Sequence, residues 1–267
     1  MNISLQKFWS SILKYFVVII GKGTLMTNEE MMTIVYNQLA IDYNCNPDDF
    51  LKDEIIFTIA AKLPGRRAMP FVNPRLEMVT FGRGVIVNVS SNLMPFVKKK
   101  LAGKSRYDVL NSKFVYGINP YFLPNVNNIK VIHINNYDFN LVDNDIKRYY
   151  KYKNFHNALQ YNTCSSRPEV LASVAKQDGK IVGIACASAD SDTMWQIGVD
   201  VLPEHRGKGI AIKLVNMLTV ETLNRGVVPY YTTDNSNISS QRVAIKCGYS
   251  PVWSHCFKTR LPKIKSW

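Results

Sequence analysis

The spacing of apolar residues changes from helical to strand-like near residue 54. Upstream, four apolar residues lie on one face of a helix and predict a helix over residues 27–40: Met31, Ile34, Val35 and Leu39. Thr27 and Glu30 have the three-residue separation of a capping box, which places the start of the compact fold near Thr27. Downstream, β-branched and apolar runs bounded by Gly, Pro and Asn predict strands over 54–61, 76–82 and 84–89.

In the C-terminal half, a group of strands comes first, and helices alternate with strands afterwards. Strands are expected over 130–134, 170–176, 180–188, 193–201, 227–232 and 252–258. Helices are expected from Pro47, from Ser91 or Asn92 through Lys100, and over 144–159, 209–225 and 237–247. Asp178 and Gly179 stand between two alternating runs and indicate a hairpin. This order predicts an α+β fold with an antiparallel meander and helices between the later strands.

The length of 267 residues favours two modules, because one domain usually has about 100 to 200 residues. The Pro- and Asn-rich stretch 118–128 is the best candidate for the boundary, which predicts an N-terminal α/β module over 1–126 and a second domain over 127–267. Residues 1–26 are expected to form a loosely attached extension, an amphipathic helix packed on the body. Its apolar run 15–20 is far shorter than the ~20 residues of a membrane span, so no membrane partner is predicted.

The net charge of +13 raises the question of nucleic acid. Residues 151–267 hold 15 Lys and Arg against 8 Asp and Glu, and the rest hold 18 against 12, so the excess is spread evenly. A nucleic-acid interface usually shows a basic stripe with interleaved aromatic residues, and the only three consecutive basic residues are Lys98, Lys99 and Lys100, with Lys104 close by. No nucleic-acid partner is predicted, and binding through the basic surface stays the third hypothesis.

The cysteines and histidines bear on compartment and metal chemistry. Five cysteines, an odd number without a C-x-x-C pair, favour reduced thiols and therefore a cytoplasmic protein. Four histidines lie far apart, without the spacing of metal ligands. No metal is predicted.

The stretch 203–215 places two glycines and two cations directly before an apolar helical pattern. A helix N-terminus has unpaired backbone N–H groups and a partial positive charge, and glycine lets the backbone approach an anion closely. Arg206 and Lys208 add side-chain cations, so a pyrophosphate site is expected here. The competing interpretation is a loop whose glycines only permit a turn. A Rossmann site lacks its third glycine, and a Walker loop is excluded because Gly209 follows Lys208.

Two motifs resemble those of the GNAT superfamily of N-acetyltransferases. The acetyl-CoA loop [QR]-x-x-G-x-[GA] matches residues 206–211, preceded by V-x-P-E at 201–204. The second segment, N-x-x-[AS] followed by G-[FY], matches Asn237, Ser240 and Gly248-Tyr249. The likeness covers roughly 127–267, and the whole chain is similar to a bacterial GNAT group with an extra N-terminal α/β module. It implies a mixed, mostly antiparallel sheet flanked by helices, with a second, smaller N-terminal domain.

The resemblance also implies where acetyl-CoA binds as acetyl donor. Strands 193–201 and 227–232 would splay, with the pantetheine arm between them pairing with the backbone near Val199 and Val201. The pyrophosphate would be held by the amides of the loop: Gly207, Lys208, Gly209, Ile210 and Ala211. Asn237, with Ser240, would bind the pantetheine, and Arg206 a phosphate. Alternatives stay open: Asn237 as a helix N-cap, and Arg206 in a surface ion pair.

Such enzymes let an amine attack the thioester directly, and many use a tyrosine or a glutamate to move protons. Position 244 holds Ala244 where many members have the tyrosine, and position 197 holds Ile197 where others have the glutamate. Asp192, Asp234 and Tyr231 are substitutes by position only, and each aspartate has a turn-forming role as its competing explanation. Tyr230 is a further tyrosine on the same strand.

The function expected from these residues is acetyl transfer from acetyl-CoA to a primary amine. The alternative is a catalytically degenerate acyl-CoA sensor, which keeps the loop without the proton handlers. The amine acceptor is not identified, and a homodimer is possible.

Overall fold

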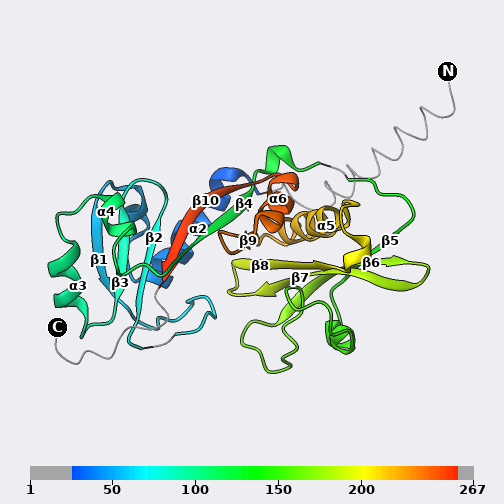
Figure 1. The fold of residues 1–267 in the computed structure, drawn as a ribbon, viewed down its shortest axis with the longest axis horizontal. Coiled ribbons are helices and arrows are strands. Elements are labelled where there is room, and N and C mark those ends of the chain that lie inside the picture. Colours follow the sequence, from blue (N-terminus) through cyan, green and yellow to red (C-terminus); the bar gives the residue numbers. More distant parts are fainter. Residues whose placement is uncertain (1–25, 72, 131, 258–267) are drawn as a thin grey trace, which may run out of the picture.

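The structure, a computed structural model, describes residues 26–71, 73–130 and 132–257 (Figure 1). These residues form a 10-stranded sheet in the order β1-β3-β2-β10-β4-β9-β8-β7-β6-β5. The strands are β1 Ile55–Ile59, β2 Leu76–Thr80, β3 Val85–Val89, β4 Gly117–Pro124, β5 Asp138–Val142, β6 Glu169–Gln177, β7 Lys180–Ala189, β8 Met194–Val201, β9 Val228–Thr232 and β10 Tyr249–Phe257. The pairs β1–β3 and β8–β9 are parallel, and the other seven are antiparallel. The predicted mixed, mostly antiparallel sheet is confirmed.

Helices cover both faces of the sheet. The α-helices are α2 Asn28–Tyr43, α3 Met94–Leu101, α4 Arg106–Leu110, α5 Ile210–Asn224 and α6 Ile238–Lys246. Short 3-10 helices are η1 Pro47–Leu51, η2 Val126–Asn128, η3 Ile146–Lys151 and η4 Pro203–His205. The side chains of α5 pack on β6 to β9 in one apolar cluster, whereas those of α2 pack on β4, β9 and β10 in another. These two clusters enclose the sheet around its centre.

Strand β10 joins the two ends of the molecule. It pairs with β2 through Ser254 to Phe257 and with β4 along nearly its whole length. Figure 1 shows it beside β4, between the end formed by β1 to β3 and the end formed by β5 to β8. Strand β4 lies inside the Pro- and Asn-rich stretch 118–128. Strands from before and after residue 126 therefore belong to one continuous sheet. The division of the chain into 1–126 and 127–267 stays a prediction.

Most predicted elements are present, and three expectations are wrong. Residues 130 and 132–134 form no strand, and the strand that enters the sheet in this region is β5 instead. The helix expected over 144–159 is only η3 followed by turns. Its backbone is diverted because the N–H groups of Asn157 and Ala158 donate to the Asp200 carboxylate rather than to helical carbonyls. Helix α3 begins later than expected, with Leu93 as its N-cap in place of Ser91 or Asn92.

The predicted capping box of α2 is confirmed, because the Thr27 hydroxyl accepts from the Glu30 N–H and the Glu30 carboxylate accepts from the Thr27 N–H. Of the extension predicted over residues 1–26, residues 1–25 lie outside the described residues, as does residue 258 of the last predicted strand. Among the residues that the structure describes, no helix has both the length and the apolar character needed to cross a membrane.

Candidate functional site

Strands β8 and β9 pair over only three positions and then separate. The ladder runs from Met194 opposite Val228 to Gln196 opposite Tyr230. Strand β8 continues to Val201 and stays paired with β7 on its other edge. Tyr231 and Thr232 of β9 no longer pair with β8 and pair only with β4, on the opposite edge of β9. Within the described residues the two strands are thus joined at one end and open at the other. This opening is the splay expected between strands 193–201 and 227–232.

The loop between β8 and α5 presents a row of backbone N–H groups. Gly207 and Gly209 have φ values of +78° and +83°, a left-handed conformation that favours glycine. Ile210, the first residue of α5, is buried and anchors the helix, while residues 206–208 are exposed. Among the described residues, the N–H groups of residues 207–211 find no hydrogen-bond partner. The loop therefore has the unpaired donors that an anion requires.

Arg206 and Lys208 flank these amides. The Nε of Arg206 donates to the Val201 carbonyl at 3.0 Å, which holds the side chain against the end of β8. In the described part of the chain, Arg206 has no acidic partner within 4.0 Å. The surface ion pair considered for Arg206 is therefore absent from those residues, and a phosphate role stays a prediction.

Helix α6 begins beside the opened seam. The Asn237 side chain accepts hydrogen bonds from the Ser240 N–H at 3.1 Å and from the Ser239 hydroxyl at 2.9 Å, so it caps the helix. The Ser240 hydroxyl lies 2.7 Å from the Tyr231 hydroxyl of β9. Three residues proposed for the site, Asn237, Ser240 and Tyr231, are thus linked where β9 meets α6.

Comparison with known proteins relates this region to a protein family. Residues 138–249 match the model of the acetyltransferase (GNAT) family, a range that contains the opened seam, the loop and α6. This part of the chain belongs to the GNAT family. No curated protein matches the sequence.

Three solved structures illustrate the likeness of the GNAT domain. A GNAT-family acetyltransferase from Colwellia psychrerythraea is 17% identical, with a TM-score of 0.44, over 57% of this chain and 60% of that one. A GCN5-related N-acetyltransferase from Sphaerobacter thermophilus is 16% identical, with a TM-score of 0.44, over 57% and 54%. An aminoglycoside N-acetyltransferase in complex with CoA is 18% identical, with a TM-score of 0.34, over 51% and 100%. Similarity this low carries no argument about activity, so the family assignment depends on residues 138–249.

The structure separates the three positional candidates for catalysis in the GNAT domain. Asp192 is exposed, and Asp234 is exposed in the turn before α6. The Asp234 carboxylate accepts from the Ser236 hydroxyl at 2.5 Å and N–H at 2.8 Å, and these bonds lower its pKa, as in a turn-forming aspartate. Tyr231 is buried, and burial raises the pKa of its phenol despite the bond to Ser240. The Tyr231 phenol therefore keeps its proton at neutral pH.

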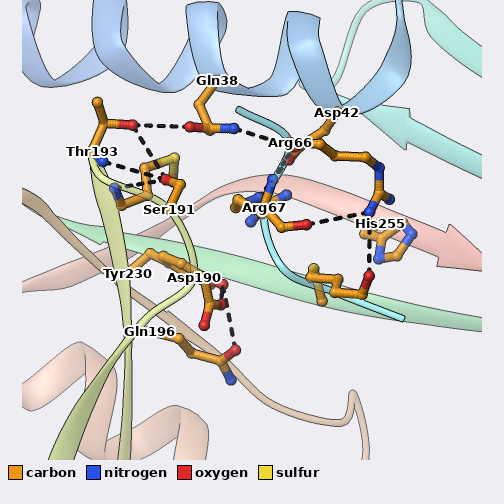
Figure 2. A network of polar contacts seen from close by, with 12 residues as sticks. Gln38, Asp42, Arg66, Arg67, Asp190, Ser191, Thr193, Gln196, Tyr230 and His255 are labelled. Atoms are coloured by element: carbon orange, nitrogen blue, oxygen red, sulfur yellow. Dashed lines mark hydrogen bonds and ion pairs between the residues drawn. The ribbon is translucent and has the colours of Figure 1, made fainter. Parts of the chain in front are cut away.

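A buried acid that the sequence did not single out lies two residues before Asp192. The Asp190 side chain is 0% exposed and forms an ion pair with Arg167 at 2.6 Å. It also accepts hydrogen bonds from the hydroxyls of Ser188, at 3.0 Å, and of Tyr230. Arg167 and Tyr230 both donate to the side chain of Gln196, the last residue of β8 that pairs with β9. Figure 2 shows Asp190, Tyr230 and Gln196 together at this point. The only sequence signal for this acid was the polar turn that follows β7. Turn residues are usually exposed, so the turn did not indicate a buried aspartate.

The face of β8 away from α5 is covered by the segment that follows η3. Asp200 accepts from the N–H and the side-chain amide of Asn157, both at 2.6 Å, and from the Ala158 N–H at 3.0 Å. A Cβ on Gly198 would lie 2.0 Å from the Asn157 carbonyl oxygen, so glycine permits this close approach. Gly198 and Asp200 thus hold this segment, while Ile197, Val199 and Val201 pack in the cluster of α5.

Proposed function

We propose that this protein transfers the acetyl group of acetyl-CoA to a primary amine. The GNAT match of residues 138–249 supports acetyl transfer as the class of reaction. The observation that carries the proposal is the row of partnerless amides at residues 207–211, placed beside the opened seam of β8 and β9. An anion at the loop and an extended arm in the seam are what a CoA thioester offers.

In this proposal each part of acetyl-CoA has its own contacts. The N–H groups of Gly207, Lys208, Gly209, Ile210 and Ala211 receive the pyrophosphate, and Arg206 adds a cation. The pantetheine arm takes the place that β9 leaves along β8, where it pairs with the backbone of Val199 and with the Val201 N–H, since the Val201 carbonyl already accepts from Arg206 Nε. Asn237 and Ser240 lie at the start of α6, on the other side of the seam.

The reaction forms one C–N bond and breaks one C–S bond. The amine nitrogen attacks the thioester carbonyl, the CoA thiolate leaves, and the proton lost by the amine ends on the thiol. An amine with a pKa of about 10.4 is unprotonated about once in 2,500 molecules at pH 7, so a base or a desolvating pocket is required for speed. We assign no base among Asp192 and Asp234, because both are exposed.

Tyr231 is the proposed proton donor to the leaving thiolate. Position 244, where a tyrosine often stands in this family, holds a fully buried alanine. The Tyr231 phenol approaches α6 from the neighbouring strand and reaches Ser240, one turn before Ala244. A phenol with a raised pKa keeps its proton until a thiolate forms nearby.

Calorimetry with acetyl-CoA and with CoA tests the binding part of the proposal. Binding of both is expected, and Gly209→Glu should abolish it because a carboxylate would occupy the anion site. Absence of binding to the wild-type protein would end the proposal. Thiol release with a panel of primary amines then tests the transfer itself.

A second function, a non-enzymatic acyl-CoA sensor, is favoured by two buried apolar residues. Ile197 and Ala244 replace the customary proton handlers and pack in the same core cluster. A sensor would bind CoA with normal affinity and release no thiol above the rate without protein. Thiol release with any amine of the panel excludes it.

A further inference from the structure

A cavity of about 320 Å³ lies on the side of the sheet that α2 covers, away from α5. Its walls come from the end of α2, the segment between β1 and β2, and strands β2, β4 and β10. Neither the GNAT motifs nor the proposed CoA site uses it. Figure 2 shows Asp42 of α2 together with Arg66, Arg67 and His255, which all contribute to its lining.

The cavity carries a surplus of positive charge. Three arginines line it, Arg66, Arg67 and Arg75, with only two carboxylates, Asp42 and Glu77. Arg67 binds Asp42 at 2.5 Å, and Arg75 binds Glu77. Arg66 also forms an ion pair with the Glu77 carboxylate, at the longer distance of 4.0 Å, and donates to two backbone carbonyls at 3.3 Å. One guanidinium charge is therefore not balanced, even with a neutral His255.

Three N–H groups of these arginines are buried without a hydrogen bond. The side chains of Arg66 and Arg75 are 7% exposed and that of Arg67 is 4% exposed. Among the described residues, Arg66 Nε, Arg67 Nη1 and Arg75 Nε have no acceptor. Buried donors are almost always satisfied, and leaving a charged one unpaired is costly. All three side chains also line the cavity, so its polar wall consists of guanidinium groups whose hydrogen bonds to the described residues are incomplete.

Aromatic rings hold the guanidinium groups in place before any ligand arrives. Arg67 lies over the Tyr121 and Tyr230 rings, 5.9 and 5.4 Å from their centres. Phe71 lies under both Arg66 and Arg75, at 5.1 and 4.7 Å. Such cation–π contacts favour the charged planar group and fix its orientation. The arginines are thus positioned without using the N–H groups that remain unpaired.

We infer that this cavity binds a small molecule through one carboxylate. A carboxylate matches the guanidinium fork, and its single charge balances the single surplus charge. Tyr43, Tyr121 and Met69 in the lining suit a compact apolar or aromatic body. The volume is at the lower end for small-molecule sites, which excludes a large ligand. This inference does not depend on acetyl transfer.

Two probes of equal shape test the charge requirement on the full chain. Phenylacetate should bind in calorimetry at least about tenfold more tightly than phenylacetamide, because only the acid offers a charged acceptor. Inorganic phosphate should bind more weakly than phenylacetate, since its second charge has no balancing cation. Equal affinity for phenylacetate and its amide, or tighter binding of phosphate, would overturn the inference without any variant being made.

Variants then locate the binding. Arg66→Gln removes the surplus charge together with the long contact to Glu77 and the contact with the Phe71 ring, and its hydrogen bonds in the wild-type protein are two contacts to carbonyls at 3.3 Å. It should weaken phenylacetate binding about tenfold or more, and Arg66→Lys should restore only part of it. Arg225→Gln is the matched control, since Arg225 pairs with Glu221 and Asp143 outside the cavity. Unchanged binding in folded Arg66→Gln would contradict the inference.

The carboxylate can belong to the acceptor amine or to a separate molecule. If it belongs to the acceptor, phenylacetate raises the KM for amines that carry a carboxylate and leaves kcat unchanged. If it is separate, phenylacetate binds without competing with any amine. Calorimetry decides whether the site exists, and this competition decides only its source, so failure of the proposed transfer leaves the binding result intact.

Discussion

Gly209→Ala tests whether the loop before α5 holds the pyrophosphate of CoA. Gly209 has a φ of +83°, and a Cβ there would meet only Ile134 Cδ1, at 3.4 Å. Steric displacement is therefore small, and the cost comes from the left-handed backbone, roughly 1–2 kcal/mol for an L-residue. The strain is relieved by turning the peptide, and this reorients the N–H groups that face the anion. The loss of one such charge-assisted bond weakens CoA binding about tenfold or more.

Gly226→Ala is the matched control at the other end of the same helix. Its φ is +73°, and a Cβ would meet nothing within 4 Å, so the backbone cost is of the same size. Urea unfolding should show that both variants lose about 1–2 kcal/mol of stability. Calorimetry with CoA should show weaker binding for Gly209→Ala alone. Equal CoA affinities in the two variants would refute the assignment of the loop.

Three further predictions concern side chains. Asp190→Asn should lower the free energy of unfolding by roughly 3–5 kcal/mol, because Arg167 loses its buried partner. The control Asp192→Asn, at an exposed residue, should change it by less than about 0.5 kcal/mol. Similar values for the two variants in urea titrations would contradict the burial argument. Burial opposes ionisation of Glu77, but His255, Arg75 and Arg66 outweigh it and lower its pKa below the ordinary 4.5. Stability is then fully present above pH 4.5 and falls as the pH drops through the folded pKa, and Glu77→Gln should flatten this slope in denaturation at pH 3 to 7. Tyr231→Phe should reduce kcat roughly 100-fold with unchanged CoA affinity, since it removes the proposed acid only; thiol release at wild-type rate would exclude that role.

Local signals predicted most elements well. The capping box of Thr27 and Glu30 marked the start of α2, and Gly209 marked the start of α5. Both are contiguous patterns whose structural effect depends on neighbouring residues only. The loop proposed to bind the cofactor could be predicted for the same reason, because its glycines and cations adjoin one another in the sequence.

Features that depend on distant partners were not visible. The apolar spacing at 144–159 resembles a helix, but Tyr149 and Phe155 pack on the sheet, and Asp200 takes the amides that a helix would use. Asp190 and Asp192 share one polar turn, and Asp190 is the one whose partners Arg167 and Tyr230 lie beside it in the fold. Such outcomes follow from tertiary packing, which a single sequence does not report.

The arginines of the cavity were missed for a related reason. Arg66 and Arg67 lie in a stretch without apolar periodicity, where charged residues are normally exposed. Their partners come from α2 and β2, which the sheet brings close. No spacing rule connects these residues along the chain.

The place of β10 bears on how the protein is made. It is synthesised after every other described strand, yet its hydrogen bonds fill the space between β2 and β4. Until residues 249–257 leave the ribosome, the nascent chain exposes two strand edges, which can pair with other chains. The N-terminal strands therefore wait for residues 249–257 before their sheet is complete, and folding during synthesis cannot finish in the order in which the strands emerge.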